Sequence, residues 1–143
     1  MINEQEILNA RILIVDDIES NILLLVEMLR EAGYQHLSST TDPRTVCALH
    51  RDNCYDLILL DLQMPGMDGF QVMEELNSIE VDGYTPVIAI TVQPNHKLRA
   101  LSSGAKDFIT KPFNLMEVKT RIHNMLEVRL LYKEIGASNK ELV

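Results

Sequence analysis

Seven residues near the start of the chain decide the fold: Arg11-Ile12-Leu13-Ile14-Val15-Asp16-Asp17. Residues 12–15 are all aliphatic, with no polar residue between them. An unbroken run of this kind is typical of a strand whose two faces are both covered, as in a parallel sheet. Two adjacent carboxylates, Asp16 and Asp17, stand at the end of this predicted strand.

Similar aliphatic runs recur further along the chain. They predict strands at Leu57–Leu60, Val87–Ile90, Asp107–Ile109 and, least clearly, His36–Ser39. Helical patterns lie between them, over residues 20–32, 42–51, 70–76 and 95–102, and from residue 115 onward. Five strands that alternate with helices predict an α/β fold, a doubly wound five-stranded parallel sheet with helices on both faces.

Capping residues predict where three of these helices begin. Ser20 or Asn21 is expected to cap the first helix, and Asp42, followed by Pro43, the second. Asn114 is expected to cap the last helix, and Gly33 stands just past the end of the first.

The last helix is predicted to extend beyond the domain that it completes. Apolar residues continue past Met125 with the spacing of a coiled-coil seam, at Val128, Leu131, Ile135 and Leu142. We therefore expect a domain over residues 1–127 and a helical linker or dimerisation segment over residues 128–143. A frayed tail is the alternative, and the chain is expected to be part of a longer protein.

Length and composition exclude several classes of protein. The chain has 143 residues, 46% of them hydrophobic, which is enough for one ordinary domain with its own core. A net charge of -8 argues against binding nucleic acid or an anionic membrane by charge. No apolar run is long enough to span a bilayer. Two cysteines without a secretory signal indicate reduced thiols in a cytoplasmic protein.

Polar residues follow four of the predicted strands. Asp16 and Asp17 follow the first, Asp61 the third, Thr91 the fourth and Lys111 the fifth. The carboxyl ends of parallel strands meet at one edge of a sheet, where ligands bind in such folds. Each residue taken singly has a structural explanation, as a helix cap, a turn residue or a surface charge.

The chemistry of this set suits one phosphate group and one metal ion. Clustered carboxylates without His or Cys favour a hard dication such as Mg²⁺. Lys111 adds a positive charge and Thr91 a hydroxyl, both suited to phosphoryl oxygens. Asp61 is the candidate nucleophile, because Asp16 and Asp17 are adjacent and better placed to hold the metal.

Four segments of the sequence resemble the receiver (response regulator) domains of two-component signalling. They are Ile14-Val15-Asp16-Asp17, Leu60-Asp61-Leu62-Gln63-Met64-Pro65-Gly66-Met67-Asp68-Gly69, Ile90-Thr91 and Phe108-Ile109-Thr110-Lys111-Pro112-Phe113. The resemblance covers residues 11–125. It implies a flavodoxin-like fold with strand order 2-1-3-4-5, and a switch protein rather than an enzyme.

The resemblance also implies a metal site and a partner. Asp17, Asp61 and the backbone carbonyl of Gln63 would bind Mg²⁺, and Asp16 would help through water. A histidine kinase or a histidine phosphotransfer protein would transfer a phosphoryl group to Asp61.

Further residues would read the phosphorylated state. Thr91 and Lys111 would contact the phosphoryl group, and Phe108 would be the switch aromatic, on the face formed by the fourth helix, fifth strand and fifth helix. The Lys111–Pro112 bond is expected to be cis. Phenylalanine in place of the family's frequent tyrosine, and Val92 in place of a small residue, are departures from the pattern.

The segment Arg121–Tyr132 resembles, less specifically, linkers that lead receivers into cyclic-di-GMP enzymes. It predicts a homodimer and an output domain beyond the C-terminus. One alternative is a stand-alone receiver that binds its target directly. The other is a Mg²⁺-dependent phosphohydrolase, which Gln63 disfavours because such enzymes need an acid two residues after the nucleophile.

Overall fold

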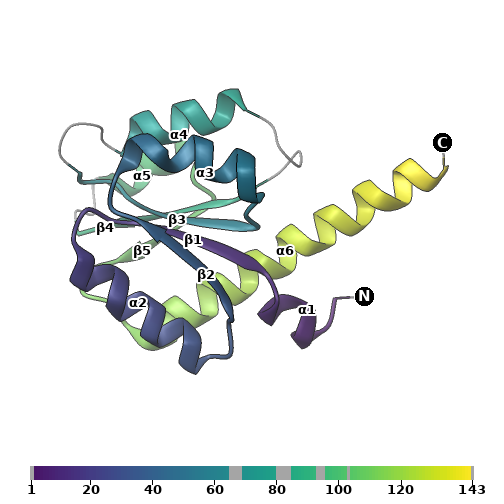
Figure 1. Cartoon of the computed structure of the whole chain (residues 1–143), viewed down its shortest axis with the longest axis horizontal. Helices are drawn as coiled ribbons and strands as arrows, with labels where there is room; N and C mark the ends of the chain where they lie inside the picture. The colour runs from purple at the N-terminus through teal and green to yellow at the C-terminus, as the bar shows by residue number, and fades with distance from the viewer. Residues whose placement is uncertain (1, 65–68, 80–84, 93–95, 103, 143) are drawn as a thin grey trace.

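The computed structural model describes residues 2–64, 69–79, 85–92, 96–102 and 104–142, without the side chains of 96–98 and 136–142. Five strands form the centre of the molecule (Figure 1): β1 (Arg11–Val15), β2 (His36–Thr40), β3 (Leu57–Asp61), β4 (Val87–Thr91) and β5 (Asp107–Thr110). The helices are α1 (Glu4–Leu8), α2 (Glu19–Glu31), the short 3₁₀ helix η1 (Pro43–Thr45), α3 (Val46–Asn53), α4 (Gly69–Ser78), α5 (His96–Ser102) and α6 (Leu115–Leu142).

The strands form one parallel sheet in the order β2-β1-β3-β4-β5, which confirms the predicted fold class. Their register aligns the strand ends. Val15 pairs with Leu60, Asp61 with Ile90, and Thr91 with Thr110. The residues at and just after these ends are therefore brought to a single edge of the sheet.

Helices cover both faces of the sheet and bury two apolar clusters. Figure 1 shows α2 and α6 on one face, and α3, α4 and α5 on the other. Ile12 and Ile14 of β1 face the first layer, where they pack with Leu25 and Ile122. Leu13 and Val15 face the second layer. An unbroken aliphatic strand is needed because both of its faces lie in core.

Two helix starts differ from the predictions. The short helix α1 was not expected, although Asn3 caps it by accepting a hydrogen bond from the Glu6 amide at 2.9 Å. Helix α2 begins at Glu19, so neither Ser20 nor Asn21 is its cap. Its N-cap is Ile18, which offers no side-chain cap, and the Asp16 carboxylate accepts the Ile18 amide at 2.9 Å in the turn before the helix.

The predicted caps Asp42 and Asn114 both bind an amide, but Asp42 caps the short 3₁₀ helix η1, and α3 begins only at Val46. Asp42 accepts a hydrogen bond from the Arg44 amide at 3.0 Å, and Asn114 accepts one from the Glu117 amide at 3.0 Å. Gly33 follows α2 with a φ of 106°, a conformation that favours glycine. The expected start of the fourth helix, Asn95, lies outside the described residues.

Helix α6 is continuous from Leu115 to Leu142 and projects out of the body (Figure 1). Its contacts with the body extend at least to Lys133. The side chain of Arg129 is fully buried, with its Nε 3.4 Å from Oδ1 of Asp56, and the Lys133 Nζ lies 3.5 Å from the same oxygen. The division of the chain after residue 127 remains a prediction.

Asp56 connects the first strand to this helix. Its second carboxylate oxygen accepts the Arg11 amide at 3.0 Å, and its own amide donates to the Arg11 carbonyl at 2.8 Å. The same buried side chain therefore joins the start of β1, the residue before β3 and the outgoing helix.

None of the described helices combines the length and apolar character needed to cross a membrane.

We predict that Arg129→Ala lowers the free energy of unfolding by about 3–5 kcal/mol, because it leaves the buried Asp56 carboxylate without the guanidinium. Lys133→Ala is the matched control. Lys133 is half-exposed, so its loss should cost less than about 1 kcal/mol. Urea denaturation followed by circular dichroism measures both, and equal losses in the two variants would contradict the assignment.

Candidate functional site

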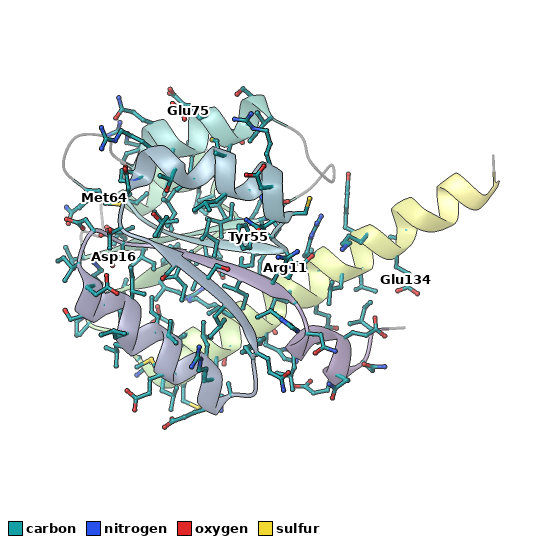
Figure 2. All side chains as sticks on the ribbon, viewed as in Figure 1. Arg11, Asp16, Tyr55, Met64, Glu75 and Glu134 are labelled. Carbon is teal, nitrogen blue, oxygen red and sulfur yellow. The ribbon has the colours of Figure 1, made fainter. Side chains whose placement is uncertain are left out.

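The ends of four strands and the residues after them place the predicted side chains at one edge of the sheet. Asp16 follows β1 directly, Asp61 is the last residue of β3, and Thr91 is the last residue of β4. Lys111 follows β5. Figure 2 shows Asp16 and Met64 at this end of the sheet, whereas Arg11 and Tyr55 lie toward the opposite end.

Three carboxylates meet at this edge. Asp16, Asp17 and Asp61 each offer one oxygen, and these oxygens lie within 4.8 Å of one another. Asp16 and Asp61 are buried, at 0% and 2% exposure. Oδ1 of Asp17 is also buried and has no hydrogen-bond partner among the described residues. A buried oxygen without a donor is costly, and a bound cation would satisfy it, so this set could hold a hard dication.

Lys111 supplies a positive charge beside these carboxylates. Its Nζ lies 3.4 Å from Oδ2 of Asp61 and 3.3 Å from Oδ2 of Asp16. The Lys111 amide donates to the Thr91 carbonyl at 3.0 Å, which continues the pairing of β4 and β5 past their ends. The peptide bond between Lys111 and Pro112 is cis, as expected. One ammonium against three carboxylates leaves an excess of negative charge that favours a cation.

The environment of Asp61 changes its acidity. Burial raises the pKa of Asp61 to about 6, and the neighbouring Asp16 carboxylate also raises it. The Gln63 amide, which donates to Oδ1 of Asp61 at 3.1 Å, and the Lys111 ammonium act in the opposite direction. Without a bound cation, the charged form of Asp61 is therefore less favoured than that of an ordinary aspartate.

The remaining predicted residues surround this cluster. Thr91 is buried at the end of β4, and the side chain of Gln63 is exposed. Phe108 on β5 is half-buried, and the guanidinium of Arg121 lies over its ring, 5.0 Å from the centroid. Residues 65–68, part of the quoted receiver segment, lie outside the described residues.

Two residues near the site were not singled out from the sequence. Arg121 of α6 holds Asp107 at 2.7 Å while it covers Phe108, so it joins the last helix to β5. Glu117 accepts a hydrogen bond from the Thr110 amide at 3.0 Å, next to Lys111. Both lie at helical positions whose role depends on contacts between elements, and the sequence pattern does not report those contacts.

Gly69 has a steric role at the site. A Cβ at this position would lie 2.7 Å from the Asp61 carbonyl oxygen and 2.7 Å from the Leu62 Cα. Both atoms belong to the backbone, so a side chain could be accommodated only by moving the end of β3. Glycine therefore allows the start of α4 to pack directly behind Asp61.

Comparisons with known proteins identify the class. The family model of the response regulator receiver domain matches residues 12–123, and the chain belongs to this family. Response regulator PleD of Caulobacter vibrioides is 38% identical over 130 residues, which are 90% of this chain and 28% of PleD. Chemotaxis protein CheY-3 of Vibrio cholerae is 26% identical over 121 residues, which are 83% of this chain and 93% of CheY-3.

A solved structure is similar in fold. The receiver domain of sensor histidine kinase PA1611 from Pseudomonas aeruginosa, which has a magnesium ion coordinated in its active site cleft, is 26% identical to this chain with a TM-score of 0.75. The match covers 83% of this chain and 98% of that domain. The chain spans little more than a quarter of the length of PleD.

We predict that Asp61→Asn stabilises the protein at pH 7 when divalent cations are removed. The pKa of Asp61 in the folded state, about 6, lies above its ordinary value of 3.8. The contribution of Asp61 to the free energy of unfolding is therefore most favourable below pH 4, and it is lost as the pH rises through 6. The variant should gain on the order of 2 kcal/mol at pH 7 and almost nothing at pH 4.

Denaturation in EDTA at the two pH values measures this difference. Asp52→Asn, at an exposed position of α3, is the control and should show no such dependence. A gain for Asp61→Asn that is equal at pH 4 and pH 7 would contradict the argument.

Proposed function

We propose that this chain is the phosphoacceptor receiver domain of a cytoplasmic two-component response regulator, with Asp61 as the phosphorylated residue. The observation that carries the proposal is the buried Asp61 carboxylate, 3.4 Å from the Lys111 ammonium and beside Asp16 and Asp17. The donor of the phosphoryl group is a histidine kinase or a histidine phosphotransfer protein. Membership of the receiver family supports both parts of this proposal.

The proposed transfer is a displacement at phosphorus. A carboxylate oxygen of Asp61 attacks the phosphorus of the donor's phosphohistidine, so a P–O bond forms while the P–N bond breaks. The bonding electron pair leaves with the imidazole nitrogen. Lys111, already beside Asp61, neutralises charge on the phosphoryl oxygens, and the Thr91 hydroxyl donates a hydrogen bond to one of them.

The residues at the site also fit a Mg²⁺ ion. Asp17, Asp61 and the Gln63 backbone carbonyl would bind it, with Asp16 acting through water. When bound, Mg²⁺ offsets the repulsion between the carboxylates and stabilises charge on the phosphoryl oxygens. The unpartnered Asp17 oxygen supports this assignment.

Phosphorylation is proposed to shift a two-state equilibrium. It adds about -1.5 to -2 charges and three acceptor oxygens at the end of β3. Thr91 and Lys111 then reorient toward these oxygens, and the Phe108 ring turns inward, away from Arg121. The face formed by α5, β5 and α6 changes with it, and a partner reads that change.

We propose that the reader is a second copy of the chain, paired through α6, and an output domain that follows it. The tail resembles linkers of cyclic-di-GMP enzymes, and the chain aligns with only part of PleD. A stand-alone receiver that binds its target directly is the second candidate, favoured by the match to 93% of CheY-3. The reading frame beyond Val143 separates the two.

We predict that Asp61→Asn abolishes phosphorylation by acetyl phosphate in the presence of Mg²⁺, because it removes the nucleophilic oxygen. Asp52→Asn is the control, and should take up phosphate as the unmodified chain does. Phosphate-affinity electrophoresis measures the uptake. If Asp61→Asn is phosphorylated to the same extent as the control, Asp61 is not the acceptor.

A further inference from the structure

We infer that two copies of the chain pair their α6 helices in parallel and in register, and that the buried Asp56–Arg129 ion pair sets which face of α6 is presented. This inference rests on the dimer proposed above and adds its geometry. Three observations carry it: an exposed apolar stripe, a buried anchor beside it, and the placement of two glutamates.

The stripe consists of Val128, Leu131, Tyr132 and Ile135, which are 40–61% exposed. Their spacing of three, one and three residues places them on one side of a helix. The four side chains are exposed although Arg129, on the same stretch of α6, is buried against the body. Single exposed apolar residues are ordinary, whereas four in one stripe indicate a surface for association.

The anchor lies on a different side of the same helix. Arg129 follows Val128 by one residue, about 100° around the helix axis, and its side chain is fully buried against Asp56. Lys133, one turn further on, reaches the same carboxylate. Because Asp56 is also hydrogen-bonded to the backbone of Arg11, these contacts fix the rotation of α6 relative to the sheet and turn the stripe toward solvent.

The charges beside the stripe favour a parallel partner. With Val128 and Ile135 at heptad positions a and Leu131 at d, Glu127 and Glu134 occupy g, and Tyr132 occupies e. In an antiparallel pair the g positions of the two helices face each other, so glutamate would oppose glutamate. In a parallel pair g faces e of the other helix, and Glu127 would face Tyr132 of the second copy.

The shapes of the stripe residues favour the same arrangement. β-branched residues at a, here Val128 and Ile135, together with leucine at d, here Leu131, are the combination that favours parallel two-stranded coiled coils. A second copy of this chain is therefore the occupant that matches both the charge and the shape of the stripe.

Disulfide trapping tests the geometry. In a background with Cys47→Ser and Cys54→Ser, Val128→Cys and Ile135→Cys are introduced in separate variants, and each is oxidised at high protein concentration with and without beryllofluoride and Mg²⁺. In a parallel pair each a residue meets its own copy within disulfide reach. We expect both variants to form covalent dimers. Glu27→Cys, at an exposed position on α2, is the control for random collision and should not.

The outcomes separate the alternatives. Dimers at one of the two positions alone indicate an antiparallel or staggered pair and overturn the inference, as do dimers at neither position. Phosphate uptake from acetyl phosphate is measured on the same variants. Uptake without cross-linking overturns the pairing and leaves the proposed function intact, whereas an unmodified chain that takes up no phosphate overturns the function itself.

The anchor is tested in the same background. Arg129→Gln should lower the dimer yield at both positions several-fold, because α6 can then rotate. Lys133→Gln, at a half-exposed position that should not affect folding, should lower the yield less and in the same direction. Circular dichroism confirms that each variant is folded. An unchanged yield in a folded Arg129→Gln or in Lys133→Gln means that Asp56 does not set the face of the helix.

Discussion

Repulsion between carboxylates at the end of the sheet is the constraint on which the rest of this molecule depends. The parallel register brings Asp16, Asp17 and Asp61 within 4.8 Å, and burial weakens the solvent screening that would otherwise separate their charges. Lys111 offsets part of this charge, while burial and, to a smaller extent, the Asp16 carboxylate raise the pKa of Asp61. The fold therefore holds an acidic site whose excess negative charge a bound cation would offset.

The two ends of the sheet have different roles, and α6 contacts both. At the carboxyl end, Glu117 accepts a hydrogen bond from the amide of Thr110, the last residue of β5. Further along α6, Arg121 covers Phe108 and holds Asp107, at the start of β5. Eight residues later, at the opposite end, Arg129 is buried against Asp56. Arg121 and Arg129 are about 12 Å apart along the helix. The rearrangement proposed around Phe108 would therefore act on a helix that is also anchored at the opposite end of the sheet.

The sequence predicted the features that leave a local pattern, and it did not predict those that depend on contacts between residues far apart in the chain. Aliphatic runs such as residues 12–15 and 57–60 identified the strands, because burial on both faces leaves a local pattern, and the acids that follow them identified the edge where they meet. The predicted start of α2 was wrong because this helix begins after Ile18 without a side-chain cap, so no capping residue in the sequence marks its start. The short α1 was missed although Asn3 could have indicated it. The Asp56–Arg129 pair joins residues 73 positions apart, and no local pattern connects them.

The continuity of α6 has a mechanical consequence. From Arg129 to Leu142 the helix rises by about 20 Å. A tilt about the buried Arg129 guanidinium would therefore move the far end of the helix more than the anchored part. A tilt of about 5° at Arg129 would displace Leu142 by nearly 2 Å, which is comparable with the shifts that helices make at the interfaces of switching proteins. A small tilt of the anchored part of α6 would therefore be amplified toward the far end of the helix.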